Sequence, residues 1–267
     1  MNPWAVDAGC PRSCAVRPPS RVGPAETAGR YAALARELTR SLLLGERLAG
    51  DVAPRVQARR VLRALGVELE AAHAPLSVPG ADTGTLIVAN HISWLDVVAL
   101  LAVEPVSFVA KKEVGRWPVV GTLARSLGTQ FIDREGGRHE LPLMVGELAK
   151  ALASGRSVLV FPQATTWCSV PAGRFRRAAF QAAVDAGVPV RPVTVGYHQE
   201  GRASTSAAFL GDEGFGRSLR RVAVARGLTV RVTTHTPLYG NDRKTLAAGA
   251  WAAVCTGETR THPHHSV

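Results

Sequence analysis

The chain has 267 residues, of which 46% are hydrophobic, enough for one large domain with a buried core. Its 32 Lys and Arg residues outnumber 21 Asp and Glu residues, and the net charge of +11 favours anionic partners. No apolar stretch reaches the roughly 18–20 residues that span a bilayer, and no nucleic-acid-binding signature is present, so neither a transmembrane span nor a nucleic-acid partner is expected.

Residues 1–28 are rich in Pro, Gly, Ser and Arg and are predicted to form a disordered leader. They have no continuous apolar segment and therefore do not resemble a signal peptide. Cys10 and Cys14 form an isolated C-x3-C pattern without a second ligand pair, so no metal site is expected. The few, dispersed cysteines do not indicate a disulfide framework, which fits a reducing cytoplasm.

Apolar residues recur at helical spacing through residues 29–66, with arginines between them. This pattern predicts a basic amphipathic hairpin of two helices, Gly29–Leu48 and Val52–Leu65. Two placements remain open. The hairpin either packs on the domain with solvated arginines or lies on an anionic membrane surface.

Residues 67–256 alternate short apolar runs with helical patterns, which predicts an α/β domain: a mostly parallel central sheet flanked by helices. The expected strands are Thr85–Ala89, Val106–Ala110, Gln130–Ile132, Ser157–Phe161, Val190–Val195 and Leu228–Thr233. The expected helices are Trp94–Val103, Trp117–Leu127, Glu140–Ser154, Phe175–Ala186, Gly216–Arg226 and Asp242–Val254. Residues 257–267 are predicted to be a flexible tail.

A histidine and an aspartate follow the first of these strands. His91 lies five positions before Asp96, at a strand-to-helix turn. A neutral imidazole there can take a proton from an alcohol, and the carboxylate can orient the ring. An alternative remains open, because Ser93 and Asp96 also match an S-x-x-D capping pattern in which Asp96 is only structural.

A second polar turn, Phe161–Thr166, ends another expected strand. Sites in parallel sheets form at the carboxyl ends of strands, so both turns are expected at one site. Cys168 lies two positions beyond this turn, but no paired histidine is evident nearby, and it is not expected to act as an acyl-carrying nucleophile.

Four blocks together resemble the glycerolipid acyltransferases of the lysophosphatidic acid acyltransferase type (1-acyl-glycerol-3-phosphate acyltransferases). They occur in the family's order between about Leu65 and Val254. They are Asn90–Asp96, similar to the family's NHxSxxD; Phe108–Glu113 through Gly128–Arg134; Phe161–Thr166; and Val188–Val193.

The resemblance implies transfer of a fatty acyl group from acyl-CoA or acyl carrier protein to the free hydroxyl of a lysophospholipid, above all 1-acyl-glycerol 3-phosphate, in phospholipid biosynthesis. It implies no cofactor beyond that thioester co-substrate and no metal. It places the enzyme as a peripheral protein on the anionic cytoplasmic face of the cell membrane.

The family's site residues can be carried over to matching positions. His91 is then the general base that deprotonates the acceptor, and Asp96 orients it. Arg134 then binds the acceptor phosphate, a role that suits the forked guanidinium group of arginine. The substrate-binding set also includes Lys111, Lys112, Gln163, Thr165 and Thr166.

The third block departs from the family's Phe-Pro-Glu-Gly-Thr, because Gln163 and Ala164 replace Glu and Gly. If the family's Glu binds the acceptor, losing its charge costs ~1–2 kcal/mol, about tenfold in rate. We therefore expect retained but slowed or redirected transfer. The alternatives are the same chemistry on a lyso-aminolipid such as lyso-ornithine lipid, or a lipid-binding protein with weakened catalysis.

Overall fold

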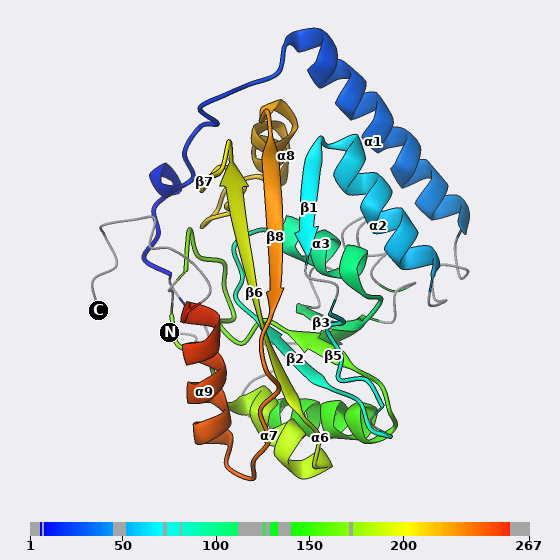
Figure 1. The fold of residues 1–267 in the computed structure, drawn as a ribbon, viewed down its shortest axis with the longest axis vertical. Coiled ribbons are helices and arrows are strands. Elements are labelled where there is room, and N and C mark those ends of the chain that lie inside the picture. Colours follow the sequence, from blue (N-terminus) through cyan, green and yellow to red (C-terminus); the bar gives the residue numbers. More distant parts are fainter. Residues whose placement is uncertain are drawn as a thin grey trace.

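The structure, a computed structural model, describes residues 6, 8–44, 52–71, 74–80, 82–111, 125, 129–132, 140–170 and 173–256. Its strands form a sheet in the order β1-β8-β6-β2-β5-β3-β4, with β7 paired to β6 (Figure 1). They are β1 (Val67–Ala71), β2 (Leu86–Ala89), β3 (Ser107–Lys111), β4 (Gln130–Ile132), β5 (Val158–Val160), β6 (Val190–Gln199), β7 (Arg202–Ala203) and β8 (Leu228–Thr234).

Neighbouring strands are parallel except where β6 pairs with β8 and with β7. The predicted mostly parallel α/β fold is therefore confirmed. Strands β2 and β5 are buried along their whole length, which explains why they are continuous apolar runs. Strands β1 and β7 were not predicted from the sequence.

The helices gather around this sheet in two groups (Figure 1). The first contains α1 (Pro24–Leu44), α2 (Ala53–Ala64) and α3 (Leu95–Val103), and α8 (Phe215–Val224) contacts α1. The second contains α6 (Glu140–Ala153), α7 (Ala178–Ala186) and α9 (Arg243–Thr256). The helix expected over 117–127 lies, apart from residue 125, outside the described residues, as does the tail at 257–267. Among the described helices, none combines the length and apolar character that a membrane crossing requires.

The two N-terminal helices pack on each other and on the domain. Between them, the buried Gln57 amide donates to the backbone carbonyl of Glu37 at 2.7 Å. Arg30 Nη1 donates to the carbonyls of Leu65 and Ala225 at 3.1 and 2.7 Å, tying α1 to the end of α2 and to the segment after α8. These contacts show the hairpin packed on the domain, which is one of the two placements that the sequence left open.

The described residues 8–28 lie against the domain instead of forming a disordered leader. The Val22 N–H donates to the carbonyl of Val224 at 2.9 Å, and helix α1 already begins at Pro24. The thiol of Cys10 lies 3.5 Å from that of Cys168. The polar composition predicted disorder. It did not indicate these contacts, because the residues that anchor the segment find their partners far along the chain.

Candidate active site

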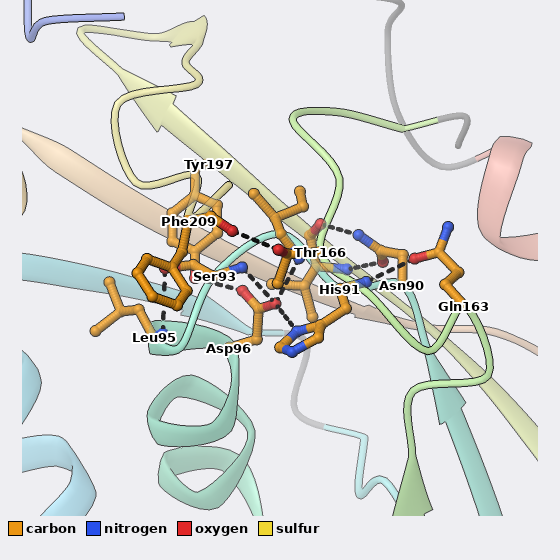
Figure 2. Close-up of polar contacts among 11 residues, drawn as sticks. Asn90, His91, Ser93, Leu95, Asp96, Gln163, Thr166, Tyr197 and Phe209 are labelled. Atoms are coloured by element: carbon orange, nitrogen blue, oxygen red, sulfur yellow. Dashed lines mark hydrogen bonds and ion pairs between the residues drawn. The ribbon is translucent and has the colours of Figure 1, made fainter. Parts of the chain in front are cut away.

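The site lies where two neighbouring parallel strands end. Strands β2 and β5 pair in register from Leu86 and Val158, so the turns that follow them lie at the same edge of the sheet. The Asn90 side chain fixes the first turn to β6, because its amide exchanges two hydrogen bonds of 2.8 Å with the backbone of Val195 (Figure 2). The expected convergence of the two turns is therefore observed.

His91 and Asp96 form a direct pair in this first turn (Figure 2). His91 Nδ1 lies 2.8 Å from Asp96 Oδ2. Asp96 is fully buried, whereas the His91 side chain is 22% exposed. The imidazole stacks on the ring of Phe161 at a centroid distance of 4.0 Å, which fixes its plane. Among the described residues, none hydrogen-bonds His91 Nε2, so this nitrogen can accept a proton from a bound hydroxyl.

Asp96 also performs the capping role that the sequence left open. Its Oδ2 accepts the backbone N–H of Ser93 at 2.9 Å, and Ser93 Oγ accepts the N–H of Leu95 at 3.2 Å. The same carboxylate oxygen accepts the N–H of Ile92 at 2.7 Å. The two interpretations are thus compatible, since one carboxylate both shapes the turn and holds the imidazole.

Tyr197 is a member of this site that sequence reasoning missed. Its hydroxyl, reaching from β6, donates to Asp96 Oδ1 at 2.6 Å. Burial raises the pKa of Tyr197 well above its ordinary value, and the negative charge of Asp96 adds to the rise. A lone tyrosine within an apolar strand carries no signal for this contact, because Tyr197 and Asp96 are 101 positions apart.

Gln163 is buried, with 3% of its surface exposed, and both ends of its amide have protein partners. Its Oε1 accepts the backbone N–H of His91 at 2.9 Å, and its Nε2 donates to the carbonyl of Gly173 at 3.1 Å. The geometry supports a brace for the His91 turn instead of the acceptor-binding role expected from the sequence.

The remaining residues of the second turn differ in their environment. Ala164 has a φ of 62°, a left-handed conformation that favours glycine. The Thr166 hydroxyl donates to the carbonyl of Phe209, so it stabilises the turn. Thr165 is half-buried, and its expected contact with a substrate stays a prediction.

The expected cationic residues are not placed by the structure. Lys111 ends β3, and only its backbone is described; Lys112 and Arg134 lie outside the described residues. Cys168 is buried and contacts Cys10 and Ser169. In the parts of the chain that are described, no group of three or more His, Cys, Asp or Glu side chains could hold a metal ion.

A histidine oriented by a buried carboxylate, at the carboxyl edge of a parallel sheet, has the geometry to take a proton from a hydroxyl. Comparison with known proteins identifies the family. The family model described as Acyltransferase matches residues 67–196. A 1-acyl-sn-glycerol-3-phosphate acyltransferase of Neisseria meningitidis serogroup B is 37% identical over 174 residues, covering 65% of this chain and 67% of that protein.

Similarity to another relative extends over nearly the whole chain. A lyso-ornithine lipid O-acyltransferase of Rhodobacter capsulatus is 32% identical over 263 residues, 90% of this chain and 93% of that protein. The crystal structure of PlsC, the 1-acyl-sn-glycerophosphate acyltransferase of Thermotoga maritima, shares the fold with a TM-score of 0.58 and 21% identity, covering 87% and 93% of the two chains. The chain belongs to the glycerolipid acyltransferase family, of the lysophosphatidic acid acyltransferase type.

Proposed function

We propose that this chain is an O-acyltransferase that moves a fatty acyl group from acyl-CoA or acyl carrier protein to the hydroxyl of 1-acyl-glycerol 3-phosphate, giving phosphatidic acid. The observation that carries the proposal is the 2.8 Å pair between His91 Nδ1 and Asp96 Oδ2, with Nε2 directed away from the carboxylate. The similarity to the Neisseria acyltransferase supports this acceptor.

In the proposed reaction, His91 Nε2 takes the proton of the acceptor hydroxyl as its oxygen attacks the thioester carbonyl carbon. Asp96 stabilises the imidazolium that forms. The tetrahedral intermediate then collapses with cleavage of the C–S bond, and the departing thiolate takes the proton from Nε2. The imidazole is neutral again after each turnover, without a covalent acyl-enzyme.

An acyl-transfer assay tests this function directly. Purified protein is given acyl-CoA and, in separate reactions, 1-acyl-glycerol 3-phosphate, lyso-ornithine lipid or an uncharged 1-acyl-glycerol, and both thiol release and acylated lipid are measured. We expect phosphatidic acid as the main product and a loss of at least about 10²-fold in the His91→Ala variant. His198→Ala, which removes a histidine on β6 that contacts Arg231, is the matched control and should retain activity.

Each other outcome of this assay has a distinct meaning. Preferential acylation of lyso-ornithine lipid would overturn the proposed acceptor and favour the activity named for the Rhodobacter relative. Lipid binding without thiol release would favour a lipid-binding protein. Unchanged turnover in His91→Ala would overturn the role of the His-Asp pair.

We also propose that the hairpin of α1 and α2 attaches the enzyme to the cytoplasmic face of the cell membrane. Exposed apolar side chains gather where α1 ends and α2 begins: Leu43 is 83% exposed and Val52 is 70% exposed. Exposed Arg36, Arg40 and Arg55 on the same helices favour anionic headgroups.

Sedimentation with vesicles tests this attachment. Leu43→Asp should weaken binding to vesicles that contain phosphatidylglycerol, whereas Leu143→Asp, at a 70% exposed position on α6, should not. Equal binding by both variants and the unmodified protein would overturn the proposed attachment.

A further inference from the structure

The two oxygens of the buried Asp96 carboxylate accept hydrogen bonds from different sets of donors. Oδ2 accepts three donors, from His91 Nδ1 and the backbone N–H groups of Ile92 and Ser93. Oδ1 accepts the Tyr197 hydroxyl at 2.6 Å. Among the described residues, Tyr197 and His91 are the only side chains that hydrogen-bond this carboxylate. Tyr197 therefore occupies the position from which a side chain can alter how Asp96 acts on His91.

The sheet holds Tyr197 in place. Its backbone pairs with Val230 in the antiparallel ladder between β6 and β8, and its side chain is 2% exposed. Asp96, in contrast, belongs to the first turn of α3, which is joined to the sheet through the His91 loop. The Tyr197–Asp96 bond thus fixes the carboxylate plane to a rigid part of the fold.

Among the described residues, burial and the charge of Asp96 raise the pKa of Tyr197, and a hydrogen bond with the Ser93 hydroxyl acts in the opposite direction. From the second turn, Phe161 faces His91 with an uncharged ring. The loop that carries Phe209 is backed by the buried Arg221–Glu213 ion pair, whose charges compensate each other.

We propose that Tyr197 is a positioning residue that sets the strength with which Asp96 stabilises protonated His91. This inference rests on the proposed function of the His-Asp pair. A donor on Oδ1 draws negative charge away from Oδ2, and the sheet holds this donor in place. Without that donor, Asp96 attracts the protonated imidazole more strongly. His91 then stays protonated, and cannot act as a base, up to a higher pH.

Two changes that alter the donor in opposite directions test the proposal. Tyr197→Phe removes the hydroxyl and keeps the ring. The chain has three tyrosines, so Tyr197 is the only one left in a Tyr31→Phe/Tyr239→Phe background. Growth on 3-fluorotyrosine then places a more acidic, stronger donor at this position alone. Tyr239→Phe by itself, at a 70% exposed position, is the control for loss of a hydroxyl.

The pH profile of kcat/KM is the main measurement. Tyr197→Phe should move its acidic limb to higher pH by about 0.5–1 unit, and 3-fluorotyrosine should move it to lower pH. The Tyr239→Phe profile should coincide with that of the unmodified protein. Coincident limbs in all proteins, or a uniform loss of rate at every pH, would overturn the proposal and leave Tyr197 a purely structural residue.

Titration of the His91 ring nitrogens by NMR gives a readout that does not require turnover. The His91 signals are assigned by their loss in His91→Gln, and folding of each variant is checked by thermal unfolding. The titration should shift in the same opposite directions as the activity limbs. If acyl transfer is absent but these shifts occur, the proposed function fails and the coupling stands; if transfer occurs without shifts, the coupling fails alone.

Discussion

Gln163 Oε1 accepts the backbone N–H of His91 at 2.9 Å, so the residue that departs from the family pattern holds the candidate base in place. The other end of the same amide donates to the Gly173 carbonyl at 3.1 Å. Only a group with one acceptor and one donor satisfies both partners. The Gln163 amide therefore satisfies both of its hydrogen-bond partners. We expect Gln163 to affect activity by holding His91 in position.

Gln163→Glu is accordingly expected to destabilise the protein. The carboxylate keeps the bond to His91 but turns its second oxygen towards the Gly173 carbonyl, at a cost of about 1–3 kcal/mol in the free energy of unfolding. Burial raises the folded-state pKa of the introduced acid, so stability is retained at pH values below its unfolded pKa and lost as the pH rises through the folded value. Urea unfolding should show a larger deficit at pH 8 than at pH 5.

Gln163→Met is the comparison for that experiment, since it keeps the size, loses both hydrogen bonds and introduces no titrating group. Its deficit should be the same at both pH values. A Gln163→Glu protein that is as stable as the unmodified protein at pH 8, and faster, would contradict the brace and restore the acceptor-binding interpretation.

Ala164→Gly should stabilise the second turn. Ala164 has a φ of 62°, where its Cβ meets the neighbouring carbonyl, and glycine removes a strain of roughly 1–2 kcal/mol at some entropic cost. We expect a net gain of up to about 1 kcal/mol, seen as a higher Tm. The same change on exposed Ala252 of α9 should lower stability by about 1 kcal/mol, so a fall in both variants would refute the strain argument.

Gly173→Ala should damage the site. A Cβ at position 173 would lie 2.2 Å from Cζ2 of Trp167, so the indole must move. The backbone N–H of Trp167 donates to the backbone carbonyl of His91 at 2.8 Å, so a displacement of residue 167 is transmitted to the turn that carries the candidate base. We expect about 1–3 kcal/mol of destabilisation together with reduced kcat. Gly146→Ala, with open space around its Cβ in α6, should gain about 0.5–1 kcal/mol and keep full activity.

Asp96→Asn tests the charge of the carboxylate separately from its shape. An amide cannot accept from all four donors, so one of them meets an NH2 group inside the protein. We expect kcat to fall by about 10²–10⁴-fold. Asp242→Asn, at the exposed cap of α9 where Asp242 accepts the Thr245 N–H, should leave kcat unchanged. Equal rates in both variants would exclude a catalytic contribution from the Asp96 charge.

The sequence by itself determined the central strands, because β2 and β5 are buried on both faces and are therefore continuous apolar runs. The strand β1 was missed, although its alternation of apolar residues with the exposed Glu68 and Glu70 is the pattern of a half-buried strand, because five residues directly after a helix are a short signal. Within the site, the His91–Asp96 pair could be predicted, since the two residues are five positions apart in a strand-to-helix turn and local geometry decides their contact.

Only the tertiary structure decided which other residues complete this pair. Tyr197 reaches Asp96 from 101 positions away, and Gln163 turns inward to His91 from 72 positions away. Both contacts depend on the order of strands in the sheet, which places β6 and β5 on either side of β2. Long-range packing of this kind leaves no periodic signal in the sequence. The local His-Asp pair could therefore be predicted, whereas the distant residues that hold it in place could not.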